Sequence, residues 1–316
     1  MTARPLRVAT HLAPGVLPAY ALAARRIGEA LGRPAELIVA ADYRRCLADA
    51  DHVCFVCSIP YILLAREHRI GMEPVAAPIL RGERYGGRPV YTSEAVVLAS
   101  GPHRSFEDLA GARWAFNEPF SHSGFVVALH ELVRRGLPAT FLGEWVEAGF
   151  HDDAIQMVLD GRADWAAIDS QVLDIWRRSV PTLRRRLRTV AVLGPSTIQP
   201  VVASTTRLTD AQRGLVRDAL LRLHEDALGR SLLRGGGITR FISVTDADYA
   251  DIRTMLAAVE SAGLLPAWWW PRWERIARRR RPALSLRRSP ERAQAAALPP
   301  PPRPRRSSPR PSPPRS

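Results

Sequence analysis

The sequence contains no lysine: all 45 of its basic residues are arginine, set against 31 acidic residues. A net charge of +14 would suit a nucleic-acid binder if the charge were spread over the whole chain. Residues 271–316, however, hold 14 arginines against Glu274 and Glu291, so this segment alone carries +12. The residues before it carry about +2 and offer no broad basic face. We therefore expect no nucleic-acid binding by the body of the protein.

Cysteine is scarce, and Cys46, Cys54 and Cys57 are its only examples. An odd number without framework spacing argues against a disulfide scaffold. Cys54 and Cys57 form a CxxC motif inside the apolar run DHVCFVCSIPY, which reads as a buried strand. Residues three apart in a strand point to opposite faces, which disfavours both a local disulfide and shared metal ligation. Both cysteines are predicted to be buried structural residues.

Long apolar runs are also missing, so no transmembrane helix is predicted. The N-terminal MTARPLRVATHL enters a strand-like pattern without an apolar h-region, so we expect no signal peptide in this sequence. The protein is then either cytoplasmic, or its true start lies upstream. No GxGxxG motif follows the first strand-like run, which argues against a dinucleotide-binding enzyme.

Short apolar runs alternate with helical patterns over the first 265 residues, which is typical of an α/β fold with mainly parallel sheets. Two helices are expected to close this body. One covers TDAQRGLVRDALLRLHEDALG, with Thr209 or Asp210 as its N-cap. The other covers TDADYADIRTMLAAVESAG, with Thr245 or Asp246 as its N-cap and Gly263 as its terminator.

The composition changes at residue 266. PAWWWPRW is followed by an Arg- and Pro-rich stretch with too few apolar residues to offset the entropy of ordering, so residues 266–316 are predicted to be a disordered tail. One interpretation is a solvated tail without function. The other is an anchor for anionic lipid or nucleic acid, in which the arginines act beside four tryptophans, Trp268, Trp269, Trp270 and Trp273. The sequence does not decide between them.

The segment NEPFSHSGF, residues 117–125, joins a strand-like ARWAF to a helix-like VVALHELVRRG. If Ser123 or its neighbour caps a helix that begins near Gly124, free N–H groups and the positive end of the helix dipole face whatever lies in front of the loop. The hydroxyls add directional donors, and the glycine lets an oxygen-rich ligand approach the backbone. The loop is thus a candidate anion site, although an ordinary capped helix explains the same residues.

Three further stretches bring polar or aromatic residues to places where α/β folds bind ligands. His151 precedes a pattern of helical period, and Asp169 ends the strand-like ADWAAIDS. Tyr91 opens a strand after a Gly-rich turn. GPSTIQP, residues 194–200, is a proline-bounded segment of the kind that connects two lobes.

In this order, GGRPVYTSEAVV, FEDLAGARWAFNEPFSHSGF, EAGFHDDAIQMVLDGRADWAAIDS and GPSTIQP resemble the phosphate/phosphite/phosphonate substrate-binding proteins of ABC transporters, which have the type II periplasmic binding fold. The resemblance runs from about Leu6 to Ala262. It implies an α/β clamshell whose first lobe is residues 1–92 with 199–265 and whose second lobe is residues 93–198, followed by the disordered Arg/Pro-rich tail. It also implies a small oxyanion ligand, an ABC permease as partner, no cofactor and a periplasmic location.

Matched position by position, the resemblance implies a set of ligand-binding residues: Phe55, Tyr91, Ser121, His122, Ser123, Gly124, His151, Asp169 and Gln171. His122 replaces the threonine of a Ser-Thr-Ser anion loop, where it either adds a cationic donor or points into solvent. His151 matches a histidine that hydrogen-bonds a phosphonate oxygen. The two aromatic residues match side chains that line the ligand.

Two positions depart from the aminophosphonate-binding members. The carboxylates that hold the ligand's ammonium group there fall on Gln171 and near Gln199. A glutamine accepts a hydrogen bond but does not neutralise an ammonium, so an aminoalkylphosphonate is not the expected ligand. Asp169 favours a monoanion, or a ligand with its own donor, unless it merely caps the following helix SQVLDIWRR.

Enzymatic functions find little support. The same fold hosts thiamine-pyrimidine synthesis in relatives with a cysteine cluster, whereas the CxxC cysteines are expected to be buried here. The two loop serines lack a nucleophile elbow. Helix capping explains Asp152 and Asp153 beside His151 better than a metal does. We expect a binding protein without catalysis; the alternatives are a cytoplasmic ligand sensor of this fold and a thiamine-pyrimidine-type protein.

Overall fold

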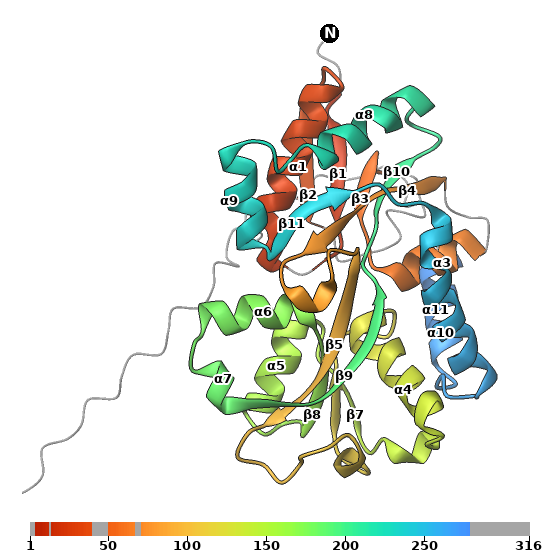
Figure 1. Ribbon diagram of the computed structural model, residues 1–316. Coiled ribbons are helices and arrows are strands. Elements are labelled where there is room, and N and C mark those ends of the chain that lie inside the picture. Colours follow the sequence, from red (N-terminus) through yellow and green to blue (C-terminus); the bar gives the residue numbers. More distant parts are fainter. Residues whose placement is uncertain (1–3, 13, 40–49, 67–70, 279–316) are drawn as a thin grey trace, which may run out of the picture. The chain divides into compact units, whose positions relative to one another are not determined.

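The computed structural model describes residues 4–12, 14–39, 50–66 and 71–278, which form two β-sheets flanked by helices (Figure 1). Cys46 and the Arg- and Pro-rich stretch after residue 278 lie outside the described residues. Cys54 and Cys57 are both buried, as predicted. Among the described residues, no helix is both long and apolar enough to cross a membrane.

The first sheet has six strands in the order β11-β4-β10-β3-β1-β2. These strands are β1 (Leu6–Thr10), β2 (Ala35–Val39), β3 (Val53–Phe55), β4 (Met72–Leu80), β10 (Val201–Ser204) and β11 (Ile238–Ile242). Strand β1 pairs in parallel with β2 and β3. Strand β10 runs antiparallel to β3 and β4, and β11 runs antiparallel to β4.

The second sheet has five strands in the order β7-β6-β8-β5-β9. These are β5 (Val90–Leu98), β6 (Trp114–Phe116), β7 (Trp145–Glu147), β8 (Trp165–Asp169) and β9 (Leu187–Thr197). Strand β6 is parallel to β7 and β8, whereas β5 is antiparallel to both β8 and β9. The expectation of mainly parallel sheets is therefore wrong. Both sheets are mixed, because β5 in the second sheet and β10 and β11 in the first run antiparallel to their neighbours.

Ten α-helices accompany the sheets in the described part of the chain. They are α1 (Leu17–Ala30), α3 (Ser58–Arg66), α4 (Val127–Arg135), α5 (His151–Leu159), α6 (Ser170–Ser179), α7 (Leu183–Arg186), α8 (Asp210–Leu221), α9 (Ala227–Gly235), α10 (Ala250–Ser261) and α11 (Trp269–Arg278). Helices α1, α8 and α9 gather at the first sheet, while α5 and α6 lie on one side of the second sheet and α4 on the other (Figure 1).

Capping residues set the ends of the two predicted closing helices. The Thr209 hydroxyl accepts the Gln212 amide, as expected. The single helix predicted from there is two helices, because Asp226 accepts the Gly229 amide and starts α9 anew. Thr245 caps a short 3-10 turn that leads into α10, and Gly263 follows in the left-handed conformation at φ 66°, as its role of terminator requires.

Helix α11 shows that the predicted start of the tail, at residue 266, is too early. Trp269 and Trp273 are both 0% exposed, whereas Trp268 is 39% exposed. The sequence WWPRWERIAR places the two buried indoles on one face of a helix and its arginines on the others, so this short stretch has enough apolar surface to dock on the body. Trp269 and Trp273 are therefore not available as an anchor for lipid or nucleic acid.

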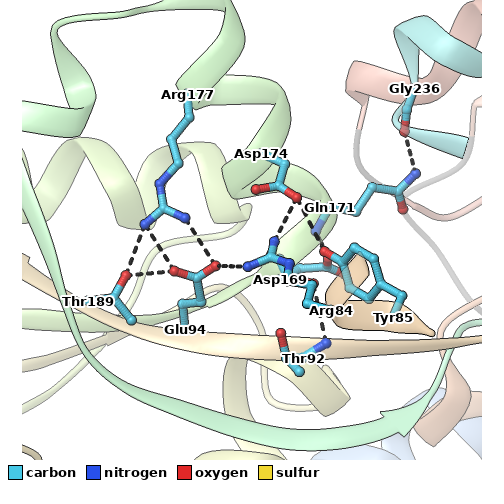
Figure 2. Close-up of polar contacts among 11 residues, drawn as sticks. Arg84, Tyr85, Thr92, Glu94, Asp169, Gln171, Asp174, Arg177, Thr189 and Gly236 are labelled. Atoms are coloured by element: carbon cyan, nitrogen blue, oxygen red, sulfur yellow. Dashed lines mark hydrogen bonds and ion pairs between the residues drawn. The ribbon is translucent and has the colours of Figure 1, made fainter. Parts of the chain in front are cut away.

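A buried carboxylate ties strand β5 to helix α6 (Figure 2). Glu94, which is 3% exposed, pairs with Arg84 at 2.8 Å and with Arg177 at 2.9 Å, and accepts the Thr189 hydroxyl at 2.6 Å. Arg84 lies in the short turn that precedes β5 and also pairs with Asp174 of α6 at 2.6 Å. Burial raises the pKa of Glu94, but the hydrogen bonds from Arg177, Thr189 and Arg84 outweigh burial and lower it overall.

We expect Glu94→Gln to destabilise the protein by about 2 kcal/mol, because both arginines lose a buried charge partner while remaining partly solvated. Since the folded-state pKa of Glu94 is lowered, its contribution is present above the unfolded-state value and is lost as the pH falls through the folded-state value. Urea unfolding measured between pH 3 and 7 should therefore show that the unfolding free energy of the variant falls less steeply than that of the natural protein as the pH drops below about 4.5.

The matched control is Glu29→Gln in α1, whose side chain is 49% exposed and pairs with Arg25 and Arg26. This change should alter the unfolding free energy by less than about 1 kcal/mol. Equal effects of the two substitutions would contradict the importance of the Glu94 cluster.

Candidate functional site

The chain leaves β6 and enters a wide, π-helical turn at His122–Val126 before α4 begins. Ser121 is its N-cap, and the Ser121 hydroxyl accepts the Gly124 amide at 3.0 Å. The cap is thus Ser121 and not Ser123, because Ser121 is the last residue with extended backbone. The first turn of a helix has N–H groups without intrahelical acceptors, so Ser121–Gly124, called the anion turn below, presents donors to its surroundings.

The anion turn has no room for a side chain at Gly124. A β-carbon there would lie 1.8 Å from Asn117 Oδ1 and 3.1 Å from His151 Cε1. Asn117 is itself buried, and its Oδ1 has no hydrogen-bond partner among the described residues. The glycine therefore serves the close packing of the turn against Asn117.

His151 is the first residue of α5 and lies against the anion turn. Its Nε2 is 3.0 Å from the Ser123 hydroxyl. Burial lowers the pKa of His151 to about 3, so the imidazole is neutral at neutral pH. In the tautomer whose Nε2–H donates to Ser123, the serine proton is free to bond an anion. A second hydrogen bond holds the turn in place: Ser93 Oγ donates to the Ser123 carbonyl at 2.6 Å.

His122 takes neither of the two roles expected for it. It is 1% exposed, so it does not point into solvent. Its Nε2 lies 2.8 Å from the Ser196 hydroxyl, near the end of β9. Burial, with a smaller effect of His130, lowers the pKa of His122 to about 3, so it is not a cation either. His122 instead joins the anion turn to the strand that leads back to the first sheet.

The two predicted aromatic residues lie at different parts of the site. The Tyr91 ring is 6.2 Å from the His122 ring, and its buried hydroxyl has no hydrogen-bond partner among the described residues. Phe55, at the end of β3, stacks on Tyr20 of α1 with ring centroids 4.1 Å apart. Burial, followed by the charge of Asp169, raises the pKa of Tyr20, so this aromatic pair lies near the carboxylate.

Asp169 is the N-cap of α6, as its alternative interpretation held. Its Oδ1 accepts the Gln171 amide at 2.7 Å, and its Oδ2 accepts Gln199 Nε2 at 2.8 Å. Burial raises the pKa of Asp169 to about 6 against the opposing effect of these bonds. The Gln171 side chain points away from Asp169, and its Nε2 donates to the Gly236 carbonyl at 2.7 Å. This hydrogen bond links α6, at the second sheet, to the segment that follows α9, at the first sheet (Figure 2).

Sequence reasoning missed several residues that hold the site together. Ser93, Asn117 and Ser196 all lie inside the motifs used above, yet their roles depend on contacts between distant segments. Cys57 was assigned a purely structural role. Burial raises the pKa of its thiol to about 12, opposed by the nearby amide of His122, which places the thiol beside the anion turn.

Other kinds of site find no support in the part of the chain that the structure describes. No group of three His, Cys, Asp or Glu side chains there could hold a metal. Asp152 accepts Trp176 Nε1 at 2.5 Å, and Asp153 accepts the Phe150 amide, as a capping residue does. A surface cavity of about 800 Å³ lies away from the anion turn, between β4, α8 and the turn after β11.

The sequence matches a known protein family over most of its length. The family described as "ABC transporter, phosphonate, periplasmic substrate-binding protein" matches residues 11–249. This range includes both sheets, apart from β1, and every predicted site residue.

Solved structures show the same fold. A binding protein component of an ABC phosphonate transporter from Pseudomonas aeruginosa matches with a TM-score of 0.72 at 15% identity, covering 87% of this chain and 95% of that one. PhnD1 from Prochlorococcus marinus, in complex with methylphosphonate, matches with a TM-score of 0.68 at 16% identity, covering 81% and 98%. A Xanthomonas citri protein bound to ATP matches with a TM-score of 0.60 at 20% identity, covering 83% and 99%.

We expect Gly124→Ala to destabilise the protein by about 1–3 kcal/mol, because the added methyl group collides with Asn117. Urea unfolding checks this expectation. The matched control is Gly235→Ala at the end of α9, where nothing lies within 4 Å of the new β-carbon, and where we expect no loss. Equal stability of the two variants would show that the anion turn is not packed as described.

Proposed function

Because the chain belongs to the phosphonate-binding family of ABC-transporter periplasmic substrate-binding proteins, we propose that it clamps a small phosphorus oxyanion, namely phosphate, phosphite or an alkylphosphonate, at the anion turn. The observation that carries this proposal is the buried Ser121–Gly124 turn with the Ser123 hydroxyl bonded to a neutral His151. As a substrate-binding protein it performs no catalysis.

The donors proposed for the oxyanion are uncharged. None of the nine predicted ligand-binding residues is arginine, and both histidines among them are neutral because they are buried. An anion would be held by the N–H groups and the dipole at the start of the α4 segment, by the hydroxyls of Ser121 and Ser123, and by the buried Tyr91 hydroxyl. His151 then acts by holding Ser123 as a donor.

The acidic side of the site argues against a ligand with an ammonium group. Gln171 and Gln199 are neutral, and both use their amide N–H groups within the protein. Asp169 is the single carboxylate among the predicted residues, and both its oxygens already accept hydrogen bonds. Each oxygen of the only carboxylate among these residues is thus already used within the protein, so we propose a ligand without an ammonium group.

Closure is proposed to report the ligand to an ABC permease. Gln171 and Arg178 of α6 donate hydrogen bonds to the carbonyls of Gly236 and Gly235, respectively. These two glycines lie at the end of α9, which packs at the first sheet. These bonds join the two sheets' helices beside the ligand site. A bound oxyanion that favours the joined arrangement would shift the population toward it, and the permease would recognise that form.

We expect Ser123→Ala to weaken methylphosphonate binding about tenfold to a hundredfold, because a hydrogen bond to a charged ligand is lost. Isothermal titration with methylphosphonate, phosphite, phosphate, sulfate and 2-aminoethylphosphonate measures this. The matched control is Ser231→Ala on the exposed face of α9, which should leave every dissociation constant unchanged. Tight binding that survives Ser123→Ala would overturn the proposed site.

The pH dependence distinguishes a neutral His151 from an imidazolium. We expect the ratio of the dissociation constants of His151→Ala and the natural protein to stay constant between pH 6 and 8, because the pKa of His151 is about 3. Taking this ratio cancels the ligand's own ionisation. A ratio that rises severalfold as the pH drops below about 6.5 would show instead that His151 binds the anion as a cation.

A further inference from the structure

Helix α11 reaches the loop before the anion turn, although it lies outside every motif that defines the site. The Trp269 indole Nε1 donates a buried hydrogen bond of 2.7 Å to the Pro119 carbonyl. The Phe120 ring has its centroid 5.2 Å from both the Trp269 and the Trp273 rings. Both indoles are 0% exposed. The loop is thus held by one hydrogen bond and two aromatic contacts.

These contacts fall on the two residues directly before the cap of the anion turn. Ser121 follows Phe120, and its amide bonds back to the Glu118 carbonyl at 3.2 Å. A displacement of Pro119 would therefore be passed to Ser121. The turn has little room to absorb it, because Gly124 packs directly against Asn117. Interiors that are filled in this way transmit strain.

Two further contacts hold α11 in place. Arg272 forms a two-bond pair with Glu147 of β7, at 2.6 and 2.7 Å. The Arg66 guanidinium, at the end of α3, lies 4.7 Å above the Trp270 ring. Helix α11 is therefore fixed to elements of both sheets while Trp269 reaches the loop.

We propose that α11 is a positioning element of the ligand site, in which Trp269 holds Pro119 and Phe120 so that Ser121–Gly124 keeps the geometry an oxyanion needs. This inference rests on the proposed function, because it assigns the turn to the ligand. Trp269 does not touch the ligand and acts through Ser121. Helix α11, which lies after the residues that match the family, then contributes to affinity.

The test uses the full chain with Trp269→Phe, which keeps an aromatic ring but removes the N–H donor. We expect methylphosphonate to bind about fivefold more weakly, the equivalent of one lost neutral hydrogen bond. Without ligand, the backbone amides of residues 121–126 should exchange hydrogen faster. The matched control, Trp270→Phe, changes the neighbouring indole, which contacts Arg66 and Trp269 and not the loop, and should leave both quantities unchanged.

A second variant, Phe120→Leu, removes the ring between the two indoles and is expected to act in the same direction, so it decides the matter if Trp269→Phe does not fold. Unchanged affinity and unchanged exchange in these variants would overturn the inference, as would equal losses in Trp270→Phe. If the natural protein binds no phosphorus oxyanion, the proposed function fails, and the exchange of residues 121–126 still decides whether α11 positions the turn.

Discussion

The described structure depends most on strand β5, which pairs antiparallel with β8 on one side and β9 on the other. Successive side chains of a strand point to opposite faces, and β5 uses both of them. Ser93 donates to the carbonyl of Ser123 on the face of the anion turn, with Tyr91 two residues earlier near His122. Glu94 points the other way and holds Arg84 and Arg177. Strand β5 thus positions both the anion turn and helix α6, whose N-cap is Asp169.

The proposed ligand site, whose nine predicted residues include no arginine and two neutral histidines, has consequences for selectivity. Burial keeps His122 and His151 neutral, so the attraction for an anion comes from oriented N–H and O–H groups. Such donors recognise the number and direction of a ligand's oxygens more than its total charge. Burial raises the pKa of Asp169 to about 6, which indicates that this part of the protein stabilises a carboxylate charge poorly. These features agree with the proposed ligand, a small oxyanion whose remaining atoms carry no charge.

Local signals in the sequence were enough to predict the α/β class, the caps at Thr209 and Thr245, and the loop that forms the anion turn. They failed where distant segments decide. The antiparallel course of β5 depends on how the chain returns to the first sheet, and periodicity does not encode direction. His122 is neutral because it is buried, and it bonds to Ser196, which is 74 residues away in the sequence.

The short helix α11 was missed for a similar reason. Its sequence leads directly into the Arg- and Pro-rich stretch, and only its contacts with Pro119 and Phe120 show that its indoles pack on the body. The division between Ser121 and Ser123 was also beyond sequence reasoning, because either serine suits an N-cap and only the backbone conformation distinguishes them.

The most direct test of the central claim is a crystal structure of the protein grown with methylphosphonate. The account predicts the phosphonate group at the anion turn, with its oxygens within hydrogen-bonding distance of the Ser123 hydroxyl and the first amides of the turn, and with no arginine in contact. A phosphonate bound elsewhere, or one held at this turn by an arginine, would contradict the account.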